Sequence, residues 1–272
     1  LGRLIKLKAN KPQLLVGFGG CLAQHMGGKV YKRFADVDFV FGTHNIHRLP
    51  LMVDQVVRDG KKITETGFSP QITSINIFAP PVNGSVSSFV SIMQGCDNYC
   101  AYCVVPYLRG PEMSRTPEDI TDEIKKLAAQ GVKEVTLLGQ NVNSYGKNLT
   151  DTCDFPTLIK KINEIDGIER IRFTTSHPKD LSEALIDCFT SVPKLCEHIH
   201  LPVQSGSSRV LKLMNRKYTA EEYLRKVDHL RRVCPSISIT SDIIVGFPGE
   251  TQKDHQETID MMEKIRFDSV FS

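Results

Sequence analysis

Hydrophobic positions along the chain form short runs that alternate with stretches where they recur every three or four residues. Beyond residue 88 the runs are rich in β-branched residues, which is typical of buried parallel strands. They cover residues 90–93, 132–138, 168–174, 195–201 and 237–245, and a sixth begins at residue 267. The stretches between them have helical periodicity. Six strand-then-helix units predict an α/β fold, a partial (β/α)6 barrel over residues 88–272 that is truncated at the sixth strand.

Local signals place the helices of this barrel. Thr116 and Pro117 start a helix over residues 117–130 that Gly131 ends, and Thr219 with Glu222 forms a capping box for a helix over 220–233. Two further helices are predicted over 181–189 and after Thr251. Their inward residues are expected to be Leu181, Leu185, Cys188 and Phe189 in the first, and Ile259, Met262 and Ile265 in the second.

The region before the barrel predicts a smaller α/β domain over residues 1–65. It holds apolar runs at 13–18 and 37–41 and a helix over about 47–58. Residues 66–87 are rich in Pro, Gly, Ser and Asn and predict a linker. The chain starts without Met and stops within a strand-like run, so we expect a fragment of a longer protein.

Composition narrows the class of protein. The 272 residues are 40% hydrophobic and 24% charged, with a net charge of +3, which permits an anionic partner without demanding one. There is no apolar run long enough to span a bilayer and no secretory signal. Eight cysteines in a chain of this length are better explained as metal ligands or core residues than as a disulfide framework. We therefore expect a cytoplasmic protein with no membrane partner.

Three cysteines lie in one short loop directly after the first barrel strand. Cys96, Cys100 and Cys103 have x3 and x2 spacing, and no fourth cysteine is close in sequence. Three thiolates can hold three corners of a 4Fe-4S cluster and leave one iron open to a further ligand. The alternative is a structural zinc ion, with Cys153 or a histidine as the fourth ligand.

The remaining cysteines differ in their surroundings. Cys188 lies on an apolar helix face and Cys196 in a strand, so both are expected to be core residues. Cys21 instead follows a strand and a Gly-Gly pair, a position at which a thiol is exposed.

The Cys-x3-Cys-x-aromatic-Cys loop resembles that of radical S-adenosylmethionine (SAM) enzymes. Further stretches resemble the methylthiotransferase family of that group, and Leu-Leu-Gly-Gln-Asn-Val-Asn at 137–143 is similar to its tRNA-modifying branch. The matching stretches are residues 20–24, 40–47, 90–96, 104–110, 135–145, 200–206 and 241–250. The resemblance implies a radical SAM barrel preceded by an incomplete methylthiotransferase domain.

The resemblance also implies two 4Fe-4S clusters and SAM as cofactors. Cys96, Cys100 and Cys103 match the ligands of the radical SAM cluster. Cys21 matches the third ligand of an auxiliary cluster whose other two ligands would fall upstream of Leu1. An RNA-binding TRAM domain would begin beyond Ser272. The implied reaction is 2-methylthiolation of N6-isopentenyladenosine beside the tRNA anticodon, with a reducing partner such as flavodoxin or ferredoxin, by a monomer.

SAM contacts can be predicted only from their position after barrel strands, where ligands collect. They are Gly139, Gln140, Asn141, Ser176, Gln204 and Gly246. No side chain is singled out as catalytic. Several cations are candidates for phosphate contacts or are simply solvated: Arg109, Arg115, Arg209, Arg216 and Lys217.

Two other hypotheses remain open. The substrate could instead be threonylcarbamoyl-adenosine of tRNA or an aspartate of a ribosomal protein. A different class of protein, a non-catalytic RNA-binding module stabilised by zinc, would also account for three close cysteines.

Overall fold

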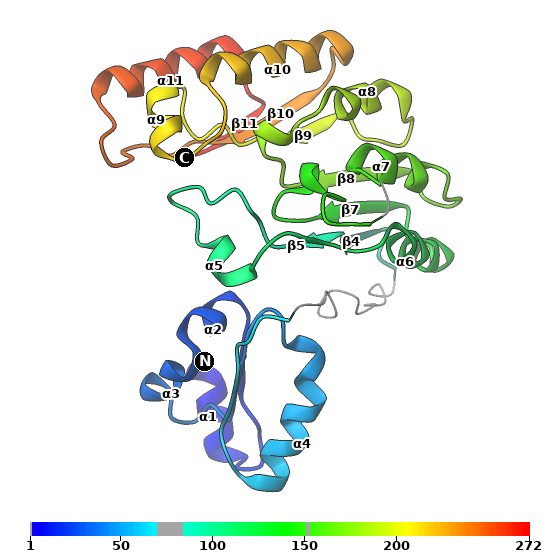
Figure 1. The fold of residues 1–272 in the computed structure, drawn as a ribbon. Helices are drawn as coiled ribbons and strands as arrows, with labels where there is room; N and C mark the ends of the chain where they lie inside the picture. Colours follow the sequence, from blue (N-terminus) through cyan, green and yellow to red (C-terminus); the bar gives the residue numbers. More distant parts are fainter. Residues whose placement is uncertain (1, 70–83, 151–152) are drawn as a thin grey trace. The chain divides into compact units, whose positions relative to one another are not determined.

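The computed structural model describes residues 2–69, 84–150 and 153–272 (Figure 1). The chain divides into two units, Leu1–Ile77 with Tyr107–Gly110 and Phe78–Pro106 with Pro111–Ser272. Most of the predicted linker, residues 70–83, lies outside the described residues. The linker and the domain limits at 65 and 88 therefore stay predictions.

The first unit contains a sheet of three parallel strands in the order β1-β2-β3. Five buried residues form its core, namely Val16, Ala23, Val30, Val37 and Val40. The described elements are α1 (Gly2–Asn10), β1 (Gly17–Gly19), α2 (Cys21–Met26), α3 (Val30–Arg33), β2 (Phe39–Phe41), α4 (Leu49–Asp59) and β3 (Ile63–Glu65), and α5 (Val105–Arg109) lies mostly in the segment that returns to this unit. The predicted α/β organisation is confirmed. The sequence did not predict β3, the third strand of the sheet.

Two glycines of β1 make room for aromatic rings on β2. A Cβ atom at Gly17 would lie 2.4 Å from the Phe39 ring, and one at Gly19 would lie 2.3 Å from the Phe41 ring. Both strands pair in parallel register, Gly17 with Phe39 and Gly19 with Phe41. A larger residue at either glycine would push the rings off the sheet.

The second unit is built on six parallel strands in chain order. β4 (Ser87–Ser91), β7 (Glu134–Leu138) and β8 (Arg170–Thr174) form one sheet, and β9 (His198–His200), β10 (Ser238–Asp242) and β11 (Ser269–Phe271) form another. A parallel bridge between Ile171 and Leu195 joins the two. A short antiparallel pair, β5 (Met93–Gln94) and β6 (Met113–Ser114), lies beside β4 in the sequence. The predicted partial (β/α)6 barrel is confirmed.

Helices connect successive strands and line one side of the row of strands (Figure 1). Neighbouring helices contact one another from α6 to α7, from α7 to α8 and from α8 to α10. They are α6 (Pro117–Ala129), α7 (Phe155–Asn163), α8 (Glu183–Ser191), α9 (Ser208–Leu213), α10 (Ala220–Val233) and α11 (Gln252–Ile265). The hydrophobic core lies between these helices and the outward side chains of the strands.

Strand bounds differ from the hydrophobic runs. The first run, 90–93, is divided between β4 and β5. β4 also begins three residues before this run, at Ser87, because its first residues are exposed or partly exposed serines that add no hydrophobic signal. The run 195–201 yields only His198–His200 as a strand, with Ile199 buried between two partly exposed histidines. Alternation along the strands indicates a half-buried sheet whose second face is polar.

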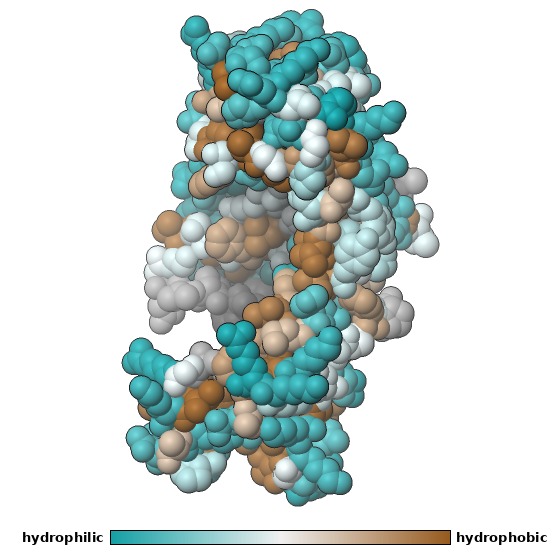
Figure 2. Space-filling view, turned by 90° about the vertical axis from the view of Figure 1, so that its left-hand side faces the viewer, coloured by the Kyte–Doolittle hydropathy of each residue, from teal (hydrophilic) through white to brown (hydrophobic). Residues whose placement is uncertain are grey.

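The sequence signals for helix ends predicted the observed bounds more accurately than the hydrophobic runs predicted the strands. Thr116 and Thr219 are N-caps, and the Thr219–Glu222 capping box is present. All four residues predicted to face inward in 181–189 are buried. In α11 the prediction is correct for Ile265, which is buried, and wrong for Met262, which is exposed; Ile259 is partly buried. The two nearest buried positions before Ile265 are Thr258 and Met261, each one residue earlier than predicted. The outer surface of the helices at the top of Figure 2 is accordingly mostly hydrophilic.

Among the described residues, no helix is both long enough and apolar enough to cross a membrane.

The capping box of α10 gives a stability test. Thr219→Ala removes the side-chain oxygen that accepts from the Glu222 backbone N–H and should lower the free energy of unfolding by about 1 kcal/mol. Urea unfolding followed by far-UV circular dichroism measures this loss. Thr190→Ala, at an exposed position late in α8, is the control and should change stability by less than about 0.5 kcal/mol. Equal stability of the two variants would contradict the assigned cap.

Candidate functional site

The three cysteines of the predicted cluster loop follow β5, at the carboxyl side of the first barrel strand. Gly95 starts the loop with φ 84° and Tyr99 continues it with φ 48°, both in the left-handed region that favours glycine. The Gly95 backbone N–H donates to Gln140 Oε1 at 2.8 Å. All three thiols are free, with Cys100 buried and Cys96 and Cys103 partly buried. The loop is therefore held in a sharp bend that keeps three thiols unpaired.

Two nitrogen groups approach the sulfur of Cys100. Arg216 Nη1 lies 3.7 Å and His177 Nε2 lies 3.9 Å from Cys100 Sγ. The Lys179 backbone N–H donates to His177 Nδ1 at 3.2 Å, so Nδ1 is the acceptor and the ring proton is on Nε2. Burial, followed by the charge of Arg216, lowers the pKa of His177 to about 2. A neutral His177 thus directs an N–H towards the sulfur, as Arg216 does.

Arg216 is a buried cation, 8% exposed. Its guanidinium donates to Pro202 O at 2.6 Å, Tyr218 Oη at 2.8 Å and Tyr102 Oη at 3.2 Å. Among the described residues no carboxylate pairs with it within 4.0 Å. An isolated buried charge is costly, so an anionic group at Cys100 would compensate it. Sequence reasoning treated Arg216 as a surface cation and missed this role.

A similar contact supports Cys96. Asn98 Nδ2 lies 3.5 Å from Cys96 Sγ, and burial raises the pKa of the Cys96 thiol to about 11. The thiol is therefore protonated at neutral pH unless a cationic partner binds it. Hydrogen bonds to ligating sulfur atoms are a recurrent feature of iron–sulfur sites and tune their potentials. The donor set fits a 4Fe-4S cluster in this respect.

Within the residues that the structure describes, no group of three or more His, Cys, Asp or Glu side chains could hold a metal ion. A 4Fe-4S cluster presents a separate iron to each thiolate, so its ligands need not meet at one point. A structural zinc ion does need such convergence, and nothing in the described part of the chain supports that alternative.

The predicted SAM residues fall into two groups. Gln140 contacts the cysteine loop through Gly95, and Gly139 bonds through its backbone to Thr174 and Thr175. Asn141 and Ser176 are buried, and Asn141 Oδ1 and Ser176 Oγ have no hydrogen-bond partner. Asn143 Oδ1 is a third such atom, so the described loops after β7 and β8 hold three buried oxygens with capacity for a ligand.

The second group lies on the other side of the barrel. Gln204 adopts φ 72° and bonds through its backbone to Asp242 and Ile244 of the neighbouring strand segment. Gly246 adopts φ 75° and is exposed in a loop that Glu250 closes, with a 2.5 Å bond from the Gly246 N–H to Glu250 Oε2. Neither has a hydrogen bond to the cysteine loop within the described residues. Gly139, from the first group, is also required by packing, because a Cβ atom at this position would lie 2.5 Å from Met93 Cγ.

In the first unit, Cys21 is the first residue of α2 and is partly buried. It follows Gly20, which adopts φ 98° and whose backbone N–H donates to Phe41 O at 3.3 Å. The residue therefore follows the carboxyl end of β1, and its thiol is partly buried rather than fully exposed as the sequence predicted.

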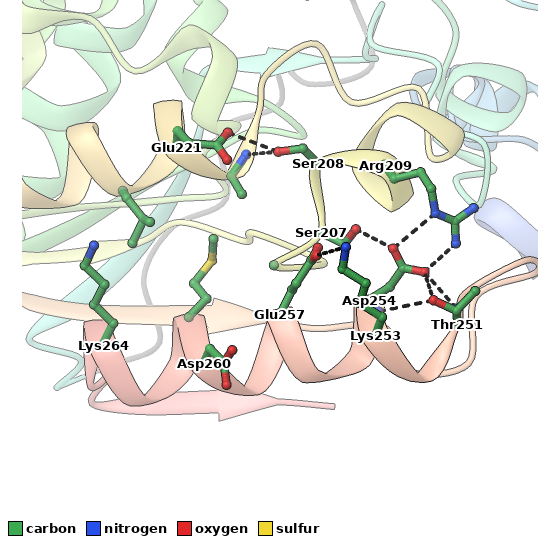
Figure 3. A pocket seen from close by; sticks show the side chains of 14 residues that line it. Ser207, Ser208, Arg209, Glu221, Thr251, Lys253, Asp254, Glu257, Asp260 and Lys264 are labelled. Atoms are coloured by element: carbon green, nitrogen blue, oxygen red, sulfur yellow. Dashed lines mark hydrogen bonds and ion pairs between the residues drawn. The ribbon is translucent and has the colours of Figure 1, made fainter.

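Two of the cations considered for phosphate contacts or solvation are buried. Arg115 pairs with Glu123 at 2.6 Å, and Arg216 lies beside Cys100, so neither is solvated at the surface. Arg209 is half-exposed and pairs with Asp254 beside Ser207 and Thr251 (Figure 3). Lys217 is exposed. A phosphate contact at Arg209 or Lys217 stays a prediction.

A half-barrel of parallel strands with three free thiols at the carboxyl end of its first strand defines a class of (β/α) enzymes with an iron–sulfur loop. A model of the radical SAM superfamily matches residues 90–262. The chain belongs to the radical SAM superfamily.

Among curated relatives, the tRNA-2-methylthio-N(6)-dimethylallyladenosine synthase of Syntrophus aciditrophicus is 60% identical over 272 residues, which is 100% of this chain and 59% of that protein. The protein of the same name from Geotalea uraniireducens is 53% identical over 269 residues, which is 98% of this chain and 60% of that protein. The chain thus spans about three fifths of the length of these relatives.

Solved structures share the fold at low identity. The radical SAM methyltransferase TsrM from Kitasatospora setae matches with a TM-score of 0.72 at 15% identity, over 95% of this chain and 55% of that one. The cobalamin-dependent radical SAM enzyme OxsB matches with a TM-score of 0.67 at 14% identity, over 96% of this chain and 41% of that one.

The Asp254 network gives a prediction about pH. Hydrogen bonds from Arg209, and then from Ser207 and Thr251, hold the pKa of Asp254 well below its usual range. A carboxylate with a lowered pKa stabilises the fold above its unfolded value, about 3.9, and this contribution is lost as the pH falls. The melting temperature of Asp254→Asn should be below that of the wild type at pH 7, and the gap should narrow below about pH 4. A gap that stays constant from pH 7 to 3 would refute the assignment. Asp166→Asn, at an exposed site, is the control.

Proposed function

We propose that this chain is the catalytic core of a tRNA methylthiotransferase that adds a 2-methylthio group to N6-isopentenyladenosine beside the anticodon. The observation that carries the proposal is the loop of the three free thiols of Cys96, Cys100 and Cys103. N–H groups of Arg216 and His177 face the Cys100 sulfur, and one of Asn98 faces the Cys96 sulfur. The relatives at 60% and 53% identity are enzymes of that name. Their agreement over the whole chain favours the tRNA substrate over a ribosomal-protein aspartate.

In this proposal the three cysteines hold a 4Fe-4S cluster and leave one iron open for SAM. When bound, the cluster would supply the electron that cleaves SAM to methionine and a 5′-deoxyadenosyl radical. The protein's own part is to shape and shield the site. Arg216 supplies positive charge beside Cys100, and burial of Arg216, His177 and Tyr218 excludes water from that side. Among the described residues, buried oxygens without a partner in the loops after β7 and β8 could accept hydrogen bonds from SAM; they are Asn141 Oδ1, Asn143 Oδ1 and Ser176 Oγ.

Cys21 is proposed as a ligand of an auxiliary 4Fe-4S cluster in the whole protein. Its support is its partly buried position at the carboxyl edge of the first unit's sheet and its match to the family. Flavodoxin or ferredoxin as the reductant, a monomeric state and a cytoplasmic location belong to the same proposal.

Removal of a single thiol should abolish the chemistry of the barrel. In the full-length enzyme, reconstituted without oxygen, Cys100→Ala should lose about four irons per chain and the reductive formation of 5′-deoxyadenosine from SAM. Cys188→Ala, at a buried thiol of α8, is the matched control and should keep both. Iron analysis and chromatography of the nucleoside product give the two readouts. An iron content unaffected by Cys100→Ala would overturn the cluster assignment.

The substrate is tested separately. Full-length enzyme, SAM and a reductant should convert isopentenylated tRNA into its 2-methylthio form, detected by mass spectrometry of the nucleosides. Cys21→Ala should keep 5′-deoxyadenosine formation but lose the methylthiolated nucleoside and about four irons. A methylthio group on threonylcarbamoyl-adenosine, or on a ribosomal-protein aspartate, would assign the other substrate.

A further inference from the structure

We propose that a basic groove between α8 and α10 binds the sugar–phosphate backbone of a double-stranded RNA stem. The groove is a cavity of about 570 Å³, and its lining includes His229 and five lysines and arginines, namely Lys179, Lys217, Arg225, Lys226 and Arg232. The inference rests on the proposed function in one respect, namely that the RNA bound in the groove carries the adenosine to be modified. What is new is the place of the RNA stem, on the second unit of the chain.

The charge of this groove differs from that of the other cavities in the described part of the chain. Its lining has five lysines and arginines against two glutamates. The cavity beside α11 in Figure 3 has three lysines and arginines against four acids, and the one between α6 and α7 has two against two. An excess of cations in a concave surface attracts a polyanion.

Several of these cations are available to a ligand. Lys217, Arg225 and Arg232 are exposed, and within the described residues none of them is within 4.0 Å of a carboxylate oxygen. The two glutamates of the lining offset part of the positive charge, and Lys179 pairs with Asp180 at 3.6 Å. Within the described part of the chain, Lys217, Arg225 and Arg232 still leave the groove with unpaired positive charge.

Lys226 has a different role. Its ammonium donates to Pro178 O at 2.7 Å and Leu181 O at 2.8 Å. It thereby ties α10 to the segment that precedes α8 and fixes the width of the groove. The groove is thus a built feature of the fold rather than a chance gathering of surface side chains.

The spacing of the cations suits a duplex backbone. Arg225, His229 and Arg232 lie at i, i+4 and i+7 on one face of α10, so the first and last are about 10 Å apart along the axis. One strand of a duplex places several phosphates along such a length, so this face can contact more than one of them. Single-stranded RNA needs exposed aromatic rings for its bases, but Tyr218 in this lining is 7% exposed. The lining therefore favours contacts to phosphates of a stem.

The inner end of the groove reaches the cysteine loop. Lys179 Nζ lies 2.5 Å from Asn98 Oδ1, within that loop. Tyr218 lines the groove, and its hydroxyl accepts from Arg216, the residue beside Cys100. A stem held along α10 would thus leave its unpaired loop next to the thiols, which is where a modified base has to be.

The test uses full-length enzyme and a plain RNA hairpin that lacks the modified adenosine. Arg225→Gln/Arg232→Gln should raise the Kd by at least about tenfold and reduce the slope of log K against log salt by about two. Lys126→Gln/Lys160→Gln, which removes two exposed charges from α6 and α7, should leave the Kd within about twofold. Arg225→Lys/Arg232→Lys should retain binding, which separates loss of charge from loss of fold.

Reductive 5′-deoxyadenosine formation with dithionite and no RNA should be the same in all these variants. If Arg225→Gln/Arg232→Gln binds the hairpin with unchanged Kd and salt slope, the inference is overturned. It is equally overturned if hairpin binding persists and only reduction by an acidic electron-transfer protein slows, which would assign the groove to a protein. If no methylthiolated nucleoside ever forms but the variant loses hairpin binding, the groove stands and the proposed function fails.

Discussion

The contact on which this site depends is that between the guanidinium of Arg216 and the sulfur of Cys100, 3.7 Å apart. A cation buried to 8% exposure and without a carboxylate partner would cost several kcal/mol if nothing compensated it. Carbonyl and hydroxyl oxygens around Arg216 satisfy its N–H groups but carry no full charge. In the proposed cluster a Cys100 thiolate would supply that charge, so Arg216 would be one half of an ion pair that is completed when the cysteine loop holds its cluster.

The loop is fixed by segments from across the barrel. Gln140, after β7, receives the Gly95 N–H, and Lys179, after β8, donates to Asn98. Asn215 donates to Tyr99 O at 2.8 Å, and the Ala101 N–H donates to Met214 O at 2.9 Å. These anchors all lie beyond the carboxyl ends of parallel strands, where such folds gather their ligands. Without these four hydrogen bonds, a loop with two residues at positive φ could change the distances between its three thiols. The four bonds hold the backbone of the loop in one conformation.

Much of this architecture could be predicted from the sequence because helix signals are local. Thr116 and Thr219 caps, the capping box and the buried stripe of α10 all depend on residues within one or two turns. The cysteine spacing is equally local. Strand bounds were less accurate, since a half-buried strand such as β4 has three polar residues and only two apolar ones. Met262 was assigned inward for a related reason, because two adjacent methionines satisfy the same periodicity and only packing chooses Met261.

Long-range contacts could not be predicted in this way. Arg216 lies 116 residues from Cys100, and Arg209 and Arg115 find carboxylates that periodicity does not identify. As a consequence, sequence reasoning selected the buried Arg115 and Arg216 beside Lys217 of the groove, and it overlooked Lys179, Arg225 and Arg232. Arg216 lies beside the cysteine loop, and Tyr218 is bonded to Arg216 on one side and lines the groove on the other. Because the ring of Tyr218 lies between Arg216 and the groove, RNA bound in the groove would lie close to the thiols at which the proposed chemistry takes place.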